Sequence, residues 1–209
     1  MEATRSGTNL DVSSRGLTSP VGKMKLTLRE RLRTGTRADH DRLDGLAGRL
    51  SFARYEDLLV FIRANCLAYR SLMAAAGHAE PMLAQRLDRA GDVLGALGTS
   101  LMDDALEVDT SGIEPIGLSY VVAGSSLGAR LIAQQSEASA DPRVRVLAEL
   151  LLDPELDRRW RDLAGELRNM TGQGEQAEEI VTSAANCFRV FQQAFEHVLG
   201  SAGARYDVR

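Results

Sequence analysis

The feature that most constrains the fold of this chain is helical hydrophobic periodicity interrupted by prolines. Apolar residues recur at steps of three, four and seven, the spacing of one buried face on an α-helix. Pro81, Pro115, Pro142 and Pro154 each stand at the start of such a segment, where the missing proline N–H costs nothing. No alternating stretch bounded by Asn-Gly or Asp-Gly predicts a β-hairpin. The pattern predicts an all-α fold, with helices over about 27–46, 53–76, 81–97, 115–135, 142–152, 154–170 and 175–199.

Residues at the predicted helix starts support these boundaries. An aspartate directly precedes both Pro142 and Pro154, the order expected of an N-cap followed by the first helical residue. Thr27 and Glu30 have the spacing of a capping box ahead of a leucine-rich run. Because no internal repeat or linker divides the chain, we expect one multi-helix, bundle-like domain. The expected division is an N-terminal tail at 1–24, the helical domain at 25–200 and a C-terminal tail at 201–209.

Composition narrows the class of protein further. The 209 residues are 44 % apolar and 26 % charged, as in soluble globular domains. A net charge of −4 argues against a general nucleic-acid binder. Cys66 and Cys187 form no metal-binding spacing and are expected to be small buried side chains. Since no window approaches 18 uncharged apolar residues and the N-terminus lacks a signal-peptide core, we expect no membrane segment and a cytoplasmic location.

The first predicted helix carries four polar side chains in a line beside its leucine stripe. Arg33, Arg37, His40 and Asp44 follow steps of four, three and four, so they share one helix face. Imidazole is a common metal ligand, and its second ring nitrogen is usually held by a carboxylate, a carbonyl or water. Asp44 could supply that carboxylate, and Arg33 could reach an anionic group of the same ligand. The alternative is a surface histidine within a salt-bridged face.

The helix predicted at 115–135 carries two glycines on one face. Gly124 and Gly128 are four residues apart, and each interior glycine costs a helix about 0.5–1 kcal/mol relative to alanine. One explanation is close helix–helix packing or a kink. The other is a flat ligand lying against bare backbone, with the small hydroxyl of Ser125 close by.

Together these features resemble the heme oxygenase family. The Arg33–His40 spacing looks like the family's proximal histidine helix, and Gly-Ser-Ser-Leu-Gly at 124–128 looks like its kinked distal helix. The stretch at 185–196, Ala-Asn-Cys-Phe-Arg-Val-Phe-Gln-Gln-Ala-Phe-Glu, resembles the terminal helix that walls the heme pocket with phenylalanine. The match covers most of 26–199 in the same order. The resemblance implies a heme oxygenase-like bundle that holds heme between the first helix and the distal helix.

The resemblance also implies roles for residues on the proximal side of the heme. His40 would ligate the iron, and Phe188 would pack against the macrocycle. Arg33 matches a basic position that meets a heme propionate, and Arg161 approximately matches a second one. Arg37 is a further candidate for contact with the heme, but on helical spacing alone and not from the family pattern.

On the distal side, the resemblance implies that Gly124 and Gly128 let the helix approach the porphyrin face. Animal-type members carry an aspartate directly after the first glycine, where it organises water. Ser125 stands there in this chain, as serine does in many bacterial members. Water would then be placed by backbone carbonyls, other ordered waters or another polar side chain. Gly124, Ser125 and Gly128 are the predicted catalytic surface.

The function implied by the resemblance is that of a biliverdin-forming heme oxygenase. Heme would be both cofactor and substrate, and O2 with electrons from an external donor would convert it to biliverdin, CO and ferrous iron. Expected partners are a ferredoxin or flavoprotein reductase and, where the product is a chromophore, a phytochrome-type bilin acceptor; no nucleic acid or membrane is expected. Two alternatives stay open. One is a heme- or bilin-binding protein without activity, and the other is a helical interaction module whose histidine and glycines are structural.

Overall fold

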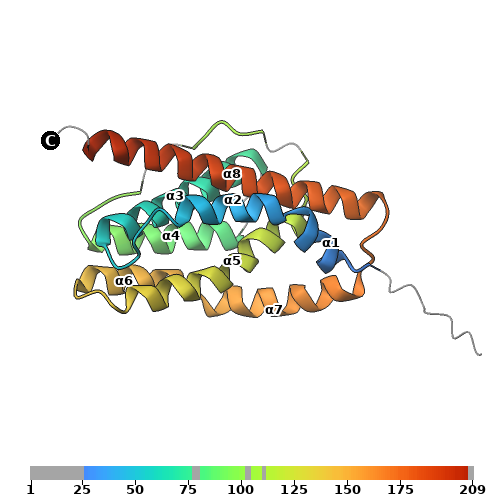
Figure 1. Cartoon of the computed structure of the whole chain (residues 1–209), viewed down its shortest axis with the longest axis horizontal. Helices are drawn as coiled ribbons and strands as arrows, with labels where there is room; N and C mark the ends of the chain where they lie inside the picture. Colours follow the sequence, from blue (N-terminus) through green and yellow to red (C-terminus); the bar gives the residue numbers. More distant parts are fainter. Residues whose placement is uncertain (1–25, 77–80, 102–104, 110–111, 207–209) are drawn as a thin grey trace, which may run out of the picture.

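The computed structural model describes residues 26–76, 81–101, 105–109 and 112–206. The fold is all-α, as predicted, and the described residues form eight helices (Figure 1). The helices are α1 (Leu28–Gly35), α2 (Arg37–Ala47), α3 (Tyr55–Ala76), α4 (Pro81–Ala96), α5 (Pro115–Ser136), α6 (Pro142–Leu151), α7 (Pro154–Asn169) and α8 (Glu175–Tyr206).

Two helices organise the bundle. α8 runs along one side and packs on α1, α2, α3 and α5, whereas α6 and α7 lie on the opposite side (Figure 1). α5 lies between these layers, in contact with α6, α7 and α8. The helix that carries His40 and the helix that carries the glycine pair therefore both rest on α8.

The first predicted helix, 27–46, is two helices in the structure. α1 ends at Gly35, and α2 follows Thr36, whose backbone has φ −103° and ψ 3°. A Cβ on Gly35 would lie 2.6 Å from Cγ1 of Val181, so α8 approaches the chain closely at this point. The Thr36 hydroxyl also donates to the Leu32 carbonyl at 2.8 Å, a bond that bends helices. The prediction of one uninterrupted helix was therefore wrong.

The predicted helix starts are confirmed. The Thr27 and Glu30 side chains accept hydrogen bonds from each other's backbone N–H, which completes the capping box. Asp141 and Asp153 are N-caps whose carboxylates accept backbone N–H groups of the first turn, each followed by proline. Glu114 caps α5 in the same way, a cap that sequence analysis did not identify. These short-range signals mark where α1, α5, α6 and α7 begin.

The ends of the domain differ from expectation at the C-terminus. α8 continues to Tyr206, so the predicted tail at 201–209 begins as helix, and 207–209 lie outside the described residues. The predicted N-terminal tail at 1–24 also lies outside them. Both cysteines are buried and free, as predicted. Burial raises the pKa of the Cys66 and Cys187 thiols to about 12, so both stay protonated at neutral pH.

One helix bears on the expectation that the chain has no membrane segment. Among the described residues, α5 is long and apolar enough to cross a membrane by length and composition. It is not an uninterrupted apolar run, because small and polar residues and the single Arg130 fall within it. A core helix of a globular domain meets the same test, and about a third of the apolar window, 33 %, is buried inside the bundle. Length and composition alone do not place α5 in a membrane.

Candidate functional site

A cavity of about 980 Å³ opens between α2, α5 and α8 and continues inward between α3, α4 and α6. This volume is at the upper end of what small-molecule and cofactor pockets usually have. The scarce aromatic residues gather here, because all five phenylalanines of the chain line the cavity together with its single tryptophan. These phenylalanines are Phe52, Phe61, Phe188, Phe191 and Phe195.

His40 and Asp44 form the α2 wall of the cavity. Nδ1 of His40 lies 3.1 Å from Oδ2 of Asp44, one helical turn further along. Phe188 of α8 contacts the imidazole edge-on, with ring centroids 5.6 Å apart and an interplanar angle of 66°. The His40 side chain is 57 % exposed and lines the cavity. With Nδ1 held by the carboxylate, Nε2 is the nitrogen available to a ligand.

The predicted arginines divide into two groups. Arg33 and Arg37 both line the cavity, and both residues are exposed at its mouth. Arg37 forms an exposed pair with Asp41, with Nε 3.7 Å from Oδ2. Arg161 lies on the exposed face of α7, where its Nε donates to the carbonyl of Asp157 at 3.3 Å, and it is not part of the cavity wall. The structure therefore brings Arg33 and Arg37 to His40 but leaves Arg161 apart.

The two glycines of α5 both line the cavity but face different surroundings. A Cβ on Gly124 would lie 3.3 Å from Cζ3 of Trp160, a contact tighter than normal side-chain packing. A Cβ on Gly128 would meet no described atom within 4 Å. Gly124 thus lets Trp160 of α7 pack against the α5 backbone, whereas Gly128 leaves open space beside the cavity.

Ser125 follows Gly124 and also lines the cavity. Its hydroxyl donates to the carbonyl of Val122 at 2.7 Å. The Ser125 proton is therefore already used within α5, and the oxygen lone pairs are what this side chain offers to water or ligand.

Tyr120 is a site residue that the sequence analysis missed. It lines the cavity one turn before Gly124, and its ring contacts Trp160 with centroids 5.7 Å apart. Burial raises the pKa of the Tyr120 hydroxyl, while a hydrogen bond with Thr36 and the positive charges of Arg29 and Arg33 act to lower it. Tyr120 therefore connects the α1–α2 bend with the α5 wall, close to a guanidinium group. Its position one helical turn before the glycine pair is the sequence feature that could have identified it.

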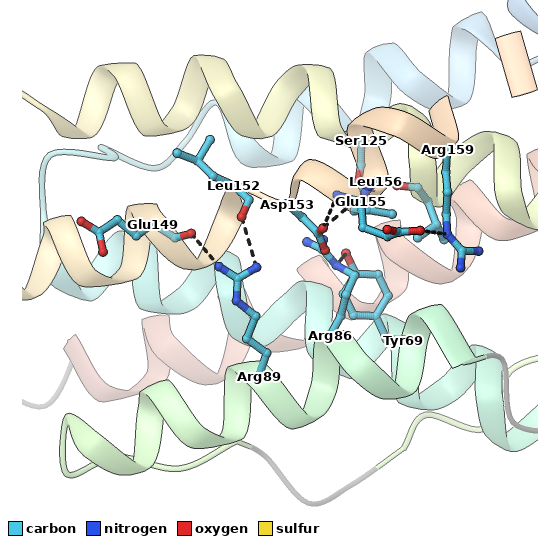
Figure 2. Close-up of polar contacts among 11 residues, drawn as sticks. Tyr69, Arg86, Arg89, Ser125, Glu149, Leu152, Asp153, Glu155, Leu156 and Arg159 are labelled. Atoms are coloured by element: carbon cyan, nitrogen blue, oxygen red, sulfur yellow. Dashed lines mark hydrogen bonds and ion pairs between the residues drawn. The ribbon is translucent and has the colours of Figure 1, made fainter. Parts of the chain in front are cut away.

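A second polar group that sequence analysis missed lies at the inner end of the cavity. Arg86 of α4 donates from Nε to the Tyr69 hydroxyl at 3.1 Å and from Nη1 to Asp153 Oδ2 at 3.3 Å (Figure 2). Burial acts to lower the pKa of Arg86, but Tyr69, Asp153 and Cys66 outweigh it and raise the pKa. Asp153 also caps α7, so one carboxylate joins α4 to the start of α7. Nothing in the spacing of these three residues reveals that they meet.

Comparison with known proteins identifies the fold. No family model and no curated protein sequence matches this chain. Among solved structures, the chain is similar to the heme oxygenase of Neisseria meningitidis, determined with NO and CO bound. The two share a TM-score of 0.61 and 23 % sequence identity over 84 % of this chain and 93 % of the other. The chain thus has the all-α heme oxygenase fold, and the fold that the sequence predicted is confirmed.

Proposed function

We propose that this protein is a heme oxygenase that binds heme in the cavity between α2 and α5. The observation that carries the proposal is the pairing of two opposite walls. One wall presents the imidazole of His40, held by Asp44 and Phe188, and the other presents the glycine-bordered backbone of α5. A flat macrocycle with an iron at its centre suits both walls at once, and the likeness to a solved heme oxygenase supports the same ligand.

The proximal wall would hold the iron through one imidazole. Among the described residues, no group of three or more His, Cys, Asp or Glu side chains could hold a bare metal ion. A single histidine does suit iron whose other ligands come from a porphyrin. Asp44, whose Oδ2 lies 3.1 Å from Nδ1, would accept the Nδ1–H, which would fix the tautomer and direct Nε2 toward the iron. Phe188 limits rotation of the imidazole and offers an apolar edge to the macrocycle.

The cavity mouth would hold the heme propionates. Arg33 and Arg37 place guanidinium groups there, and guanidinium pairs with carboxylate through two parallel hydrogen bonds. Tyr120 adds a hydroxyl near Arg33. These contacts would fix the rotation of the heme about the iron and therefore the carbon at which the ring opens. Arg161 does not line the cavity and is therefore not part of this proposed propionate site.

The distal wall would leave room for O2. Gly128 presents no side chain toward the open space, and neither Gly124 nor Ser125 offers an acidic group. When bound, heme supplies the iron that activates O2 and the ring that is oxidised, with electrons from an external donor. Biliverdin, CO and ferrous iron are the proposed products. A ferredoxin or flavoprotein reductase is the proposed donor, and a phytochrome-type bilin acceptor is one proposed destination of the product.

The experiment uses the purified full chain, reconstituted with hemin. We expect a Soret band that changes position and intensity in His40→Ala, followed by conversion to bilin absorbance when ascorbate is added in air. Arg42→Ala is the matched control, because Arg42 lies on the same helix and is exposed but does not line the cavity. A Soret band that is absent, or is identical in His40→Ala, contradicts heme binding through this histidine.

A second candidate function is heme or bilin binding without turnover. The observation that favours it is the Ser125 hydroxyl, whose proton is bonded to the Val122 carbonyl and is not available to organise water. The same preparation decides between the two functions. A stable Soret band that never yields bilin absorbance under electron supply supports the binding protein and contradicts the oxygenase.

A further inference from the structure

The segment of α2 around His40 has almost no apolar anchor of its own. From Arg37 to Arg42, all of which the structure describes, no side chain is buried. The buried side chains nearest to this segment are Thr36 before it and Leu46 after it. Because burial normally fixes a helix against its neighbours, this part of α2 must be held by other contacts.

Gln192 of α8 supplies one such contact. Its side chain is only 5 % exposed, and its Nε2 donates to the carbonyl oxygen of Asp39 at 2.8 Å. Asp39 directly precedes His40. A helical carbonyl has a second lone pair besides the one used by its own helix, so it can accept this bond without breaking α2. Gln192 therefore ties the α2 backbone to α8 at the residue next to the candidate iron ligand.

The second contact comes from the same face of α8. Phe188 lies one helical turn before Gln192, and its ring contacts the imidazole of His40 at 5.6 Å between centroids. α8 thus holds the backbone beside His40 with an amide and the ring of His40 with a phenyl group. Two contacts one turn apart fix both the depth of the imidazole in the cavity and its tilt.

We propose that Gln192 is a positioning residue for His40. Its amide holds the Asp39 carbonyl at a fixed position along α8. The imidazole of His40 therefore stays against Phe188 and presents Nε2 to the cavity. The consequence for iron ligation rests on the proposed function, whereas the effect on the imidazole itself does not. Gln192 touches no proposed substrate atom and acts only through the backbone of α2.

The variant Gln192→Met tests this, because methionine is unbranched and similar in length but donates no hydrogen bond. Gln193→Met is the matched control, since Gln193 is the exposed neighbour of the same type. In the ligand-free protein, we expect the NMR shifts of the His40 ring protons to move toward free-imidazole values in Gln192→Met only, as the ring leaves Phe188. With hemin, we expect Kd to rise about 2- to 10-fold and the iron–histidine stretching frequency of the ferrous complex to change.

His40 ring shifts that match the wild type in folded Gln192→Met overturn the proposal. If that variant does not fold by circular dichroism, Gln192→Leu makes the same comparison. Failure of the proposed function has a different signature. Wild-type protein would then bind no hemin through His40, while the ligand-free NMR comparison would still decide whether Gln192 positions the imidazole.

Discussion

Substitutions at Gly128 should change the stability of the protein and its affinity for heme in different ways. It lies in the interior of α5, is exposed, borders the cavity and has no described atom within 4 Å of an added Cβ. Replacing an interior helical glycine by alanine normally stabilises by about 0.5–1 kcal/mol. For a domain of this size, that corresponds to a rise in Tm of about 1–4 °C. We therefore expect Gly128→Ala to melt at a higher temperature without ligand.

A longer side chain at the same position should have the opposite effect on heme. Leucine also favours helix, so Gly128→Leu should keep its helix content in the ligand-free state. Its side chain would occupy space that the macrocycle needs, and overfilling a packed site costs about 1–3 kcal/mol, or roughly 5- to 150-fold in Kd. Hemin titration followed at the Soret band measures this loss.

The control for both variants is Gly165→Ala. Gly165 lies inside α7, also has no described atom within 4 Å of an added Cβ, and does not line the cavity. It should gain stability as Gly128→Ala does and bind hemin like the wild type. Hemin affinity that is unchanged in Gly128→Leu would refute the claim that heme lies against this part of α5.

Three further predictions concern the scaffold. Gly172→Ala should lower the free energy of unfolding by about 1–3 kcal/mol, because the added Cβ would lie 2.5 Å from the backbone oxygen of Thr27. A denaturant midpoint equal to that of the wild type would contradict this close approach. Asp153→Ala should lower the free energy of unfolding by about 1–3 kcal/mol, since it removes the α7 cap and a partner of the largely buried Arg86. Thermal melts that show no loss of stability would argue against that link. The capping bond with Thr27 lowers the pKa of Glu30, so its stabilisation is present above the unfolded pKa near 4.5 and is lost as pH falls through the lower folded value. Glu30→Gln should therefore be less stable than the wild type at pH 7 and nearly equal to it at low pH, and a difference that does not shrink on acidification would count against the cap.

Short-range chemistry explains why the helices were predictable. Asp141, Asp153 and the Thr27–Glu30 box act within one turn, so their sequence spacing already contains their geometry. The break at Thr36 combines a local bond, from the Thr36 hydroxyl to the Leu32 carbonyl, with the close approach of Val181 from α8. No local pattern encodes that distance, and the predicted helix therefore ran through the bend.

The same distinction applies to the candidate site. Arg33, Arg37, His40 and Asp44 share one face of nearly continuous helix, and the structure places all four along the cavity. The role of Arg161 was inferred from its approximate position in a helix, and the sequence does not fix how that helix is rotated toward the cavity.

Successive residues of an α-helix are rotated by about 100° about its axis, so an error of one position changes which side chain faces a cavity. In α7, Trp160 lines the cavity and packs against Gly124, while the next residue, Arg161, faces outward. The meeting of Arg86, Tyr69 and Asp153 depends on how α4, α3 and the N-cap of α7 are packed together. Contacts of this kind follow from tertiary packing and have no sequence signature.

Product formation from bound heme is the decisive measurement for the proposed oxygenase. Purified protein reconstituted with hemin is supplied with electrons in the presence of O2, and heme loss, bilin absorbance and CO release are followed together. We expect bilin and CO to appear in equimolar amounts to the heme consumed, and His40→Ala to abolish both. Heme that persists under sustained electron supply, or bleaches without bilin and CO, would contradict the proposed reaction.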